Sequence, residues 1–176
     1  MKVIHLIPSA FDYFNDIRDK AMALVNVERE MGIDAEAYTL QYGAATRREQ
    51  NLISQKAPGL NFSGLINGGD LINDLGNYDI VHLHCPFFGL AKNLLAWKKS
   101  NPDKILVATV WREMKITDLF SVFVYLYNCY YWPKISKLCS RVIDKIHLTY
   151  TADELKLLHS DMEAKACVSI YSSFIS

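Results

Sequence analysis

Short apolar runs alternate with amphipathic stretches along most of the chain. The run Val3–Ile7 is closed by Pro8, and similar runs occupy Ile33–Thr39, Ile80–Leu83 and Ile105–Val110. Short apolar runs bounded by turn residues are typical of buried strands. Where such a run is nearly continuous, as in Ile80–Leu83, it predicts a parallel strand that is covered on both faces.

The stretches between these runs have helical periodicity. Ile17, Ala21 and Leu24 fall on one face of a helix that Gly32 terminates. Further helices are predicted for residues 90–99, for Thr117–Lys145 with a break or bend at Pro133, and for residues 152–160. Further strands are predicted for Ile146–Tyr150 and Ala166–Tyr171. The alternation predicts one α/β domain over residues 1–176, a Rossmann-like doubly wound parallel sheet.

Composition narrows the function classes. The 176 residues carry a formal net charge of +0, which gives no electrostatic reason to expect nucleic acid as a partner. The four cysteines form no CxxC pair, so reduced thiols in a cytoplasmic protein are expected. The apolar run before Pro8 is too short for a signal peptide or a membrane span.

The stretch "NYDIVHLHCPFFGL" carries the candidate chemistry. His82 and His84 are two residues apart on a predicted strand, so both point to one face. His84 lies nearer the carboxyl end, where open α/β sheets bind ligands. It is either a cleft residue, together with the loop Phe87, Phe88 and Gly89, or a strand-end histidine with protein partners. His82 is interpreted as structural.

The His-x-His pair also resembles the first ligand pair of amidohydrolase-type metal hydrolases. Those sites need more ligands from several later strands. The chain has five histidines in total, and His5 falls inside the first predicted strand. No metal is therefore expected, and a metal-dependent hydrolase that uses His82 and His84 is kept as a third alternative.

Residues 119–145 combine aromatic and basic side chains. Trp132 closes an aromatic-rich segment, and four cations follow at intervals of three and four residues: Lys134, Lys137, Arg141 and Lys145. On a continuous helix these cations share one face, and aromatic rings beside a basic stripe are typical of a helix at a membrane surface. The alternative is a core helix whose last turns are solvated by lysines.

Six segments together resemble the N-terminal domain of family 4 retaining glycosyltransferases, in order and spacing over nearly the whole chain: "MKVIHLIPSA", "EREMG", "IDAEAYTL", "YDIVHLHCPFFG", "KILVATVW" and "IHLTYTADELKLL". The resemblance implies one half of a GT-B enzyme, in which two Rossmann-like domains face a cleft. It implies that this half handles the acceptor, whereas the C-terminal half binds the nucleotide-sugar and carries paired glutamates.

The sequence departs from that family in three places. The paired-glutamate motif is missing, so we expect the C-terminal donor-binding domain to be absent from this chain and the chain to be inactive alone. The turn "PSAFDYFND" after the first strand has no glycine, and Trp111 stands where the family often has a histidine. A missing domain or partner subunit is therefore expected, with no cofactor bound by this chain itself.

The resulting hypothesis is an acceptor-side domain for sugar transfer from a nucleotide-sugar to a polysaccharide or lipid-linked acceptor. His84 and the loop from Phe87 to Gly89 would face the cleft. Trp111, Arg112 and Lys115 would form a neighbouring wall, with the two cations holding an acceptor phosphate. The alternative from another class is a non-catalytic binding or scaffolding protein. The location expected is cytoplasmic, at the inner face of a membrane if the basic stripe binds lipid.

Overall fold

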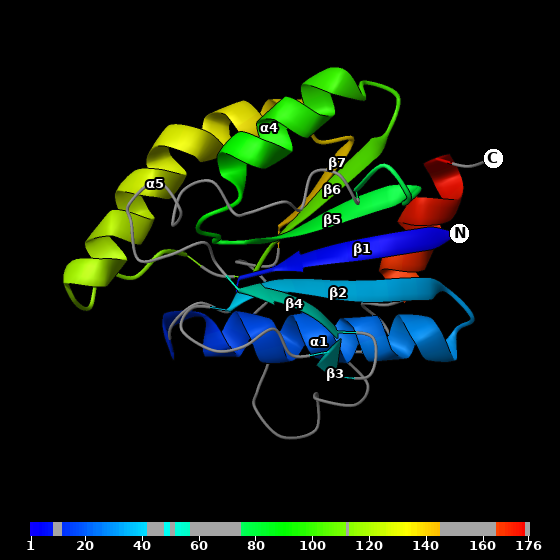
Figure 1. The fold of residues 1–176 in the computed structure, drawn as a ribbon, viewed down its shortest axis with the longest axis horizontal. Coiled ribbons are helices and arrows are strands. Elements are labelled where there is room, and N and C mark those ends of the chain that lie inside the picture. Colours follow the sequence, from blue (N-terminus) through cyan, green and yellow to red (C-terminus); the bar gives the residue numbers. More distant parts are fainter. Residues whose placement is uncertain are drawn as a thin grey trace.

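The chain folds around one seven-stranded sheet (Figure 1). The computed structural model describes residues 1–8, 12–41, 48–49, 52–56, 75–111, 113–144 and 165–174. The strands are β1 (Lys2–Ile7), β2 (Asp34–Gln41), β3 (Arg48–Glu49), β4 (Leu52–Lys56), β5 (Ile80–Cys85), β6 (Ile105–Val110) and β7 (Arg141–Asp144). The helices are α1 (Asn15–Glu30), α4 (Ala91–Ser100), α5 (Leu119–Ile135), the short 3-10 turns Asp12–Phe14 and Ser136–Leu138, and a terminal helix over residues 165–174.

The sheet has the strand order of a Rossmann fold. Its order is β3-β4-β2-β1-β5-β6-β7, and every pair is parallel except the two-residue β3 against β4. In chain order the parallel strands follow the 3-2-1-4-5-6 arrangement of dinucleotide-binding folds. The direction of winding reverses between β1 and β5. This confirms the predicted fold class and its four principal strands.

Helices cover both faces of the sheet. The buried side of α1 consists of Ile17, Ala21, Leu24, Val25 and Glu28, and it packs beside β1 and β2. Because the winding reverses between β1 and β5, right-handed crossovers place α4 and α5 on the opposite face (Figure 1). The terminal helix shares the α1 face, since the Tyr171 hydroxyl donates to Glu28 at 3.1 Å.

Two predicted elements are wrong. The helix predicted over Thr117–Lys145 ends at Ile135, because the chain returns to the sheet: the Ser140 amide donates to the Leu106 carbonyl at 2.7 Å, and β7 pairs with β6 from Arg141 onward. The strand predicted over Ala166–Tyr171 lies within the terminal helix. A short apolar run fits either periodicity, and here it is the helical spacing of Cys167 and Tyr171 that buries both side chains.

Several predicted elements agree with the structure. Helix α1 ends before Gly32, whose φ of 83° lies in the left-handed region that favours glycine. The helix predicted for residues 90–99 is α4. The elements predicted for Ile146–Tyr150 and residues 152–160 lie outside the described residues. Among the helices that the structure describes, none is long and apolar enough to be a membrane span.

Candidate functional site

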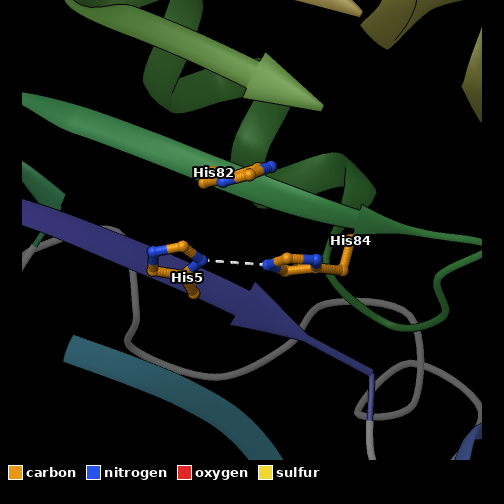
Figure 2. Close-up of side chains that lie close together, drawn as sticks. All are labelled: His5, His82 and His84. Carbon is orange, nitrogen blue, oxygen red and sulfur yellow. Dashed lines mark hydrogen bonds between the residues drawn. The ribbon is translucent and has the colours of Figure 1, made fainter. Parts of the chain in front are cut away.

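Three histidines from two strands meet in the core (Figure 2). His5 of β1 is the register partner of His82 of β5, and His84 follows two residues later on the same face. All three side chains are fully buried. The ring centroids of His82 and His84 are 4.5 Å apart, and that of His5 lies 4.9 Å from His82 and 5.3 Å from His84. Parallel register therefore gathers three imidazoles in the core.

A chain of hydrogen bonds connects two of these rings to a buried carboxylate. Trp111 Nε1 donates to His84 Nδ1 at 2.8 Å, His84 Nε2 lies 3.0 Å from His5 Nδ1, and His5 Nε2 lies 2.7 Å from Glu28 Oε2. An indole N–H can only donate, so Nδ1 of His84 carries no proton. Neutral His84 must then donate from Nε2 to His5, and neutral His5 from Nε2 to Glu28. Trp111 thus sets both tautomers.

A second chain reaches the same carboxylate from the terminal helix. The Tyr171 hydroxyl donates to Glu28 Oε1 at 3.1 Å and lies 2.5 Å from His82 Nδ1. The hydroxyl has one proton, which it donates to Glu28. The Tyr171 oxygen must therefore accept from His82 Nδ1–H. His82 Nε2 then accepts from the Thr109 hydroxyl at 2.7 Å. We call the seven side chains of both arms the histidine network: Trp111, His84, His5, Glu28, Tyr171, His82 and Thr109.

Burial keeps His82 and His84 neutral. Desolvation lowers the pKa of His82 well below its ordinary value, and the charges that His84 and His5 would carry lower it further. Desolvation, followed by the charge that His5 would carry, likewise lowers the pKa of His84. The pKa of Tyr171 is raised by burial and then by the neighbouring Glu28 charge. These directions agree with the tautomers that the hydrogen bonds require.

The spacing of these groups invites comparison with a metal centre. Ligand atoms of His5, His82 and His84 lie within 4.8 Å of one another, as do those of Glu28, His82 and Cys167. All six ring nitrogens, however, already have a protein partner. A metal on His84 Nε2 would put the proton on Nδ1, facing the N–H of Trp111. The arrangement fits a hydrogen-bonded network and leaves no ring lone pair free for a metal.

The loop after β5 is packed, not exposed. Phe87 is fully buried and Phe88 is 7% exposed, with Tyr127 against both rings. Asn128 fixes the Phe87 backbone through bonds of 3.3 Å to its N–H and 2.7 Å to its carbonyl. Helix α5 covers both phenylalanines, so this part of the loop expected to face the cleft is packed in the core. Gly89 has φ 88°, a backbone conformation that favours glycine at this turn.

Other predicted cleft residues differ in exposure. Trp111 is 7% exposed, and its ring stacks on that of His84 at a centroid distance of 5.8 Å. Arg112 lies outside the described residues. Lys115 is exposed, and its backbone is fixed at both ends: its carbonyl accepts from the Tyr13 hydroxyl at 2.8 Å, and its N–H donates to that oxygen at 3.1 Å. These bonds join the segments that follow β1 and β6.

Helix α5 presents a second apolar face to solvent. Leu119, Phe123, Leu126 and Tyr130 recur at intervals of four, three and four residues and are 74%, 46%, 57% and 62% exposed. This spacing forms one stripe along the helix. Its buried face is a different set: Ser121, Val124, Tyr127, Asn128 and Ile135. The stripe is a feature that the sequence pattern did not separate from the core face.

The basic residues near this stripe are not on one helical face. Lys134 is exposed on α5, Lys137 follows in the 3-10 turn, and Arg141 begins β7. The expected single stripe is wrong because the helix ends at Ile135. Trp132 is partly buried against the core, and Lys145 lies outside the described residues. Lys134 Nζ lies 3.2 Å from the centroid of the Tyr130 ring, a cation–π contact at the end of the apolar stripe.

Sequence reasoning missed four members of the network. Glu28 could have been found, since it continues the apolar series Ile17, Ala21 and Leu24 at helical spacing and so predicts a buried acid. His5 had a weaker signal as a histidine in a buried strand. Tyr171 and Thr109 had none, because their partners are distant in sequence.

Comparison with known proteins adds no identification. No protein-family model matches the chain, and no curated protein is significantly similar to it.

Proposed function

We propose that this chain is the acceptor-side domain of a GT-B glycosyltransferase. The observation that carries the proposal is the reversal of strand order between β1 and β5 in a 3-2-1-4-5-6 sheet. Open α/β sheets bind ligands beyond the carboxyl ends of their strands at such a switch point. The segments that resemble family 4 glycosyltransferases include β1, β2, β5 and β6, so the similarity extends across both sides of that point.

The residues best suited to an acceptor lie beyond β6. Lys115 offers an exposed ammonium on a backbone that Tyr13 fixes, which suits a phosphate of a lipid-linked or polysaccharide acceptor. Arg112 precedes it by three residues. The nucleotide-sugar would bind to a second domain or partner subunit, and this chain would supply no cofactor and no transfer activity alone. His84 and Trp111 would act indirectly, because their polar atoms are engaged with each other.

A ligand-binding titration tests the proposal that this chain binds the acceptor. A short-chain polyprenyl diphosphate disaccharide should bind the wild-type chain and bind more weakly to Lys115→Ala. Lys99→Ala, which removes an exposed lysine on α4, is the matched control. UDP-glucose and GDP-mannose should bind with Kd of about 1 mM or weaker, near −4 kcal/mol. Micromolar binding of a nucleotide-sugar would contradict the acceptor-side role. Binding of neither class would favour a scaffolding protein.

We further propose that the domain works on the cytoplasmic surface of an anionic membrane. The apolar stripe of α5 is exposed beside Lys134, Lys137 and Arg141, and the sequence has no acidic residue between Asp118 and Asp144. Each cation near an anionic bilayer contributes about 1 kcal/mol, so the three together contribute about 3 kcal/mol, or roughly a hundredfold in affinity.

Vesicle co-sedimentation separates this proposal from a merely solvated helix. Vesicles with anionic lipid should retain the chain at low salt and release it at high salt, because the Debye length falls from about 10 Å at 0.1 M to about 3 Å at 1 M. Changing Lys134, Lys137 and Arg141 to Gln should abolish binding. The matched control changes Lys20, Lys92 and Lys99, exposed lysines on α1 and α4. Equal loss in both triple variants would mean that net charge, not this surface, decides binding.

A further inference from the structure

Glu28 is a carboxylate in the core. Its side chain is fully buried, and its oxygens accept from His5 of β1 and Tyr171 of the terminal helix. Burying a charge is costly unless hydrogen bonds compensate for the lost hydration. The acceptor site proposed above makes no use of this group. Its two hydrogen bonds instead connect segments that lie 23 and 143 residues away in the sequence.

The Trp111 arm of the network has no place for another proton. The Nδ1 lone pair of His84 accepts from Trp111, and that of His5 accepts from His84. A proton added to either nitrogen would face an N–H already directed at it. Trp111 cannot reverse its bond, because an indole nitrogen has no lone pair to offer. The arm therefore persists only while both rings are neutral.

The terminal helix depends on this network for its polar attachment. Cys167 and Tyr171, one turn apart, are its two buried side chains, with Val168 and Ile170 partly buried. The Tyr171 hydroxyl contacts both Glu28 and His82. Ten residues of this helix are described, and a helical segment of ten residues is marginal in water without tertiary contacts. Its docking thus depends on a small apolar contact and one shared hydroxyl.

We propose that the histidine network is a latch that holds the terminal helix on the α1 face only while His82 and His84 are neutral, and that acid releases this helix before the sheet unfolds. The titratable groups that meet there are Glu28 from α1, His5 from β1, His82 and His84 from β5, and Cys167 and Tyr171 from the terminal helix. Burial lowers the pKa of His82 and His84, so proton uptake favours the state in which these rings regain water. Release therefore occurs as the pH falls below the ordinary histidine range.

Amide hydrogen exchange tests the latch directly. After correction for intrinsic rates, protection of residues 165–174 should fall by about tenfold per pH unit for each proton taken up, between pH 6.5 and pH 5. Protection of α4, which lies on the other face, should change far less. Tyr171→Phe should already exchange fast in residues 165–174 at pH 8, whereas Tyr130→Phe, which removes an exposed hydroxyl from α5, should behave as wild type. The proposal would be overturned if protection of residues 165–174 stayed constant from pH 8 to pH 5, or if protection of α4 fell in parallel with it.

A second variant tests the direction of the hydrogen bonds. Trp111→Phe keeps an aromatic ring but removes the N–H, so His84 Nδ1 becomes free to take a proton. Release of residues 165–174 should then move to higher pH than in wild type. Imidazole ¹⁵N spectra of the wild type at pH 8 should show Nε2–H for His5 and His84 and Nδ1–H for His82. An Nδ1–H tautomer at His84 would overturn the assignment whether or not the variant folds.

Discussion

Replacing Glu28 by glutamine distinguishes the two arms of the histidine network. Glutamine offers one acceptor oxygen and one NH₂ group, so it cannot accept from both His5 and Tyr171. The Trp111 arm cannot reverse, hence the amide oxygen must face His5. The NH₂ group then donates to the Tyr171 oxygen. The Tyr171 hydroxyl turns to His82 Nδ1, and His82 Nε2–H donates to the Thr109 hydroxyl, which rotates to accept.

This reversal limits the cost of the substitution. Each polar atom of the network keeps one hydrogen-bond partner, although the Thr109 hydroxyl proton loses His82 Nε2 as its acceptor. What is lost is the charge assistance of two hydrogen bonds, since a bond to a charged group is worth about 1.5–3 kcal/mol and a neutral one about 1 kcal/mol. Burying a charge also costs desolvation energy, so removing the Glu28 charge offsets part of that loss. Glu28→Gln should thus lower the free energy of unfolding by about 1–2 kcal/mol. Glu28→Leu leaves the His5 Nε2–H without an acceptor and should cost about 1–3 kcal/mol more.

Urea denaturation and imidazole ¹⁵N spectra together test this reasoning. Glu30→Gln, an exposed position on the same helix, should stay within about 0.5 kcal/mol of wild type. In Glu28→Gln the proton of His82 should move from Nδ1 to Nε2, while His5 and His84 keep Nε2–H. If His82 kept its wild-type tautomer, or if His84 changed instead, the deduction from Trp111 would be refuted. Equal stability of Glu28→Gln and Glu28→Leu would refute the argument about unpaired donors.

Three further expectations concern pH, metal and nucleotide-sugars. Because the folded pKa values of His82 and His84 lie below the unfolded value of 6.5, their contribution to the free energy of unfolding is constant above that pH and falls below it by about 1.4 kcal/mol per pH unit for each histidine. Urea midpoints from about pH 7.5 to pH 5.5 measure the slope, and a flat profile would contradict the burial of neutral rings. Elemental analysis of protein purified without chelator should find no stoichiometric zinc, manganese or iron, whereas one equivalent that His84→Ala removes would revive the hydrolase alternative. Equilibrium dialysis with labelled UDP-glucose should detect less than half saturation at 1 mM, and the reverse would assign donor binding to this domain.

The sequence by itself determined the fold class and most of the elements. Strand β5 and helix α1 were predictable because apolar periodicity is local: it depends on which neighbours share a face, not on distant partners. The same local signal failed for residues 165–174, where helix and strand spacing fit equally well. It also failed beyond Ile135, because the chain turns back to pair with β6, and that pairing is decided by a distant strand.

Only the tertiary structure decided the chemistry of the core. Register places His5 opposite His82, and the crossover of α1 brings Glu28 over both. Tyr171 joins Glu28 from 143 residues away, which no periodicity can indicate. Burial then decides the protonation state and the hydrogen-bond partners of these side chains, which the residue types alone do not determine. His84 is a neutral acceptor for Trp111 and not an exposed cleft residue. A buried polar atom needs a hydrogen-bond partner, and the Trp111 N–H is the donor that lies next to His84 Nδ1 in the folded chain.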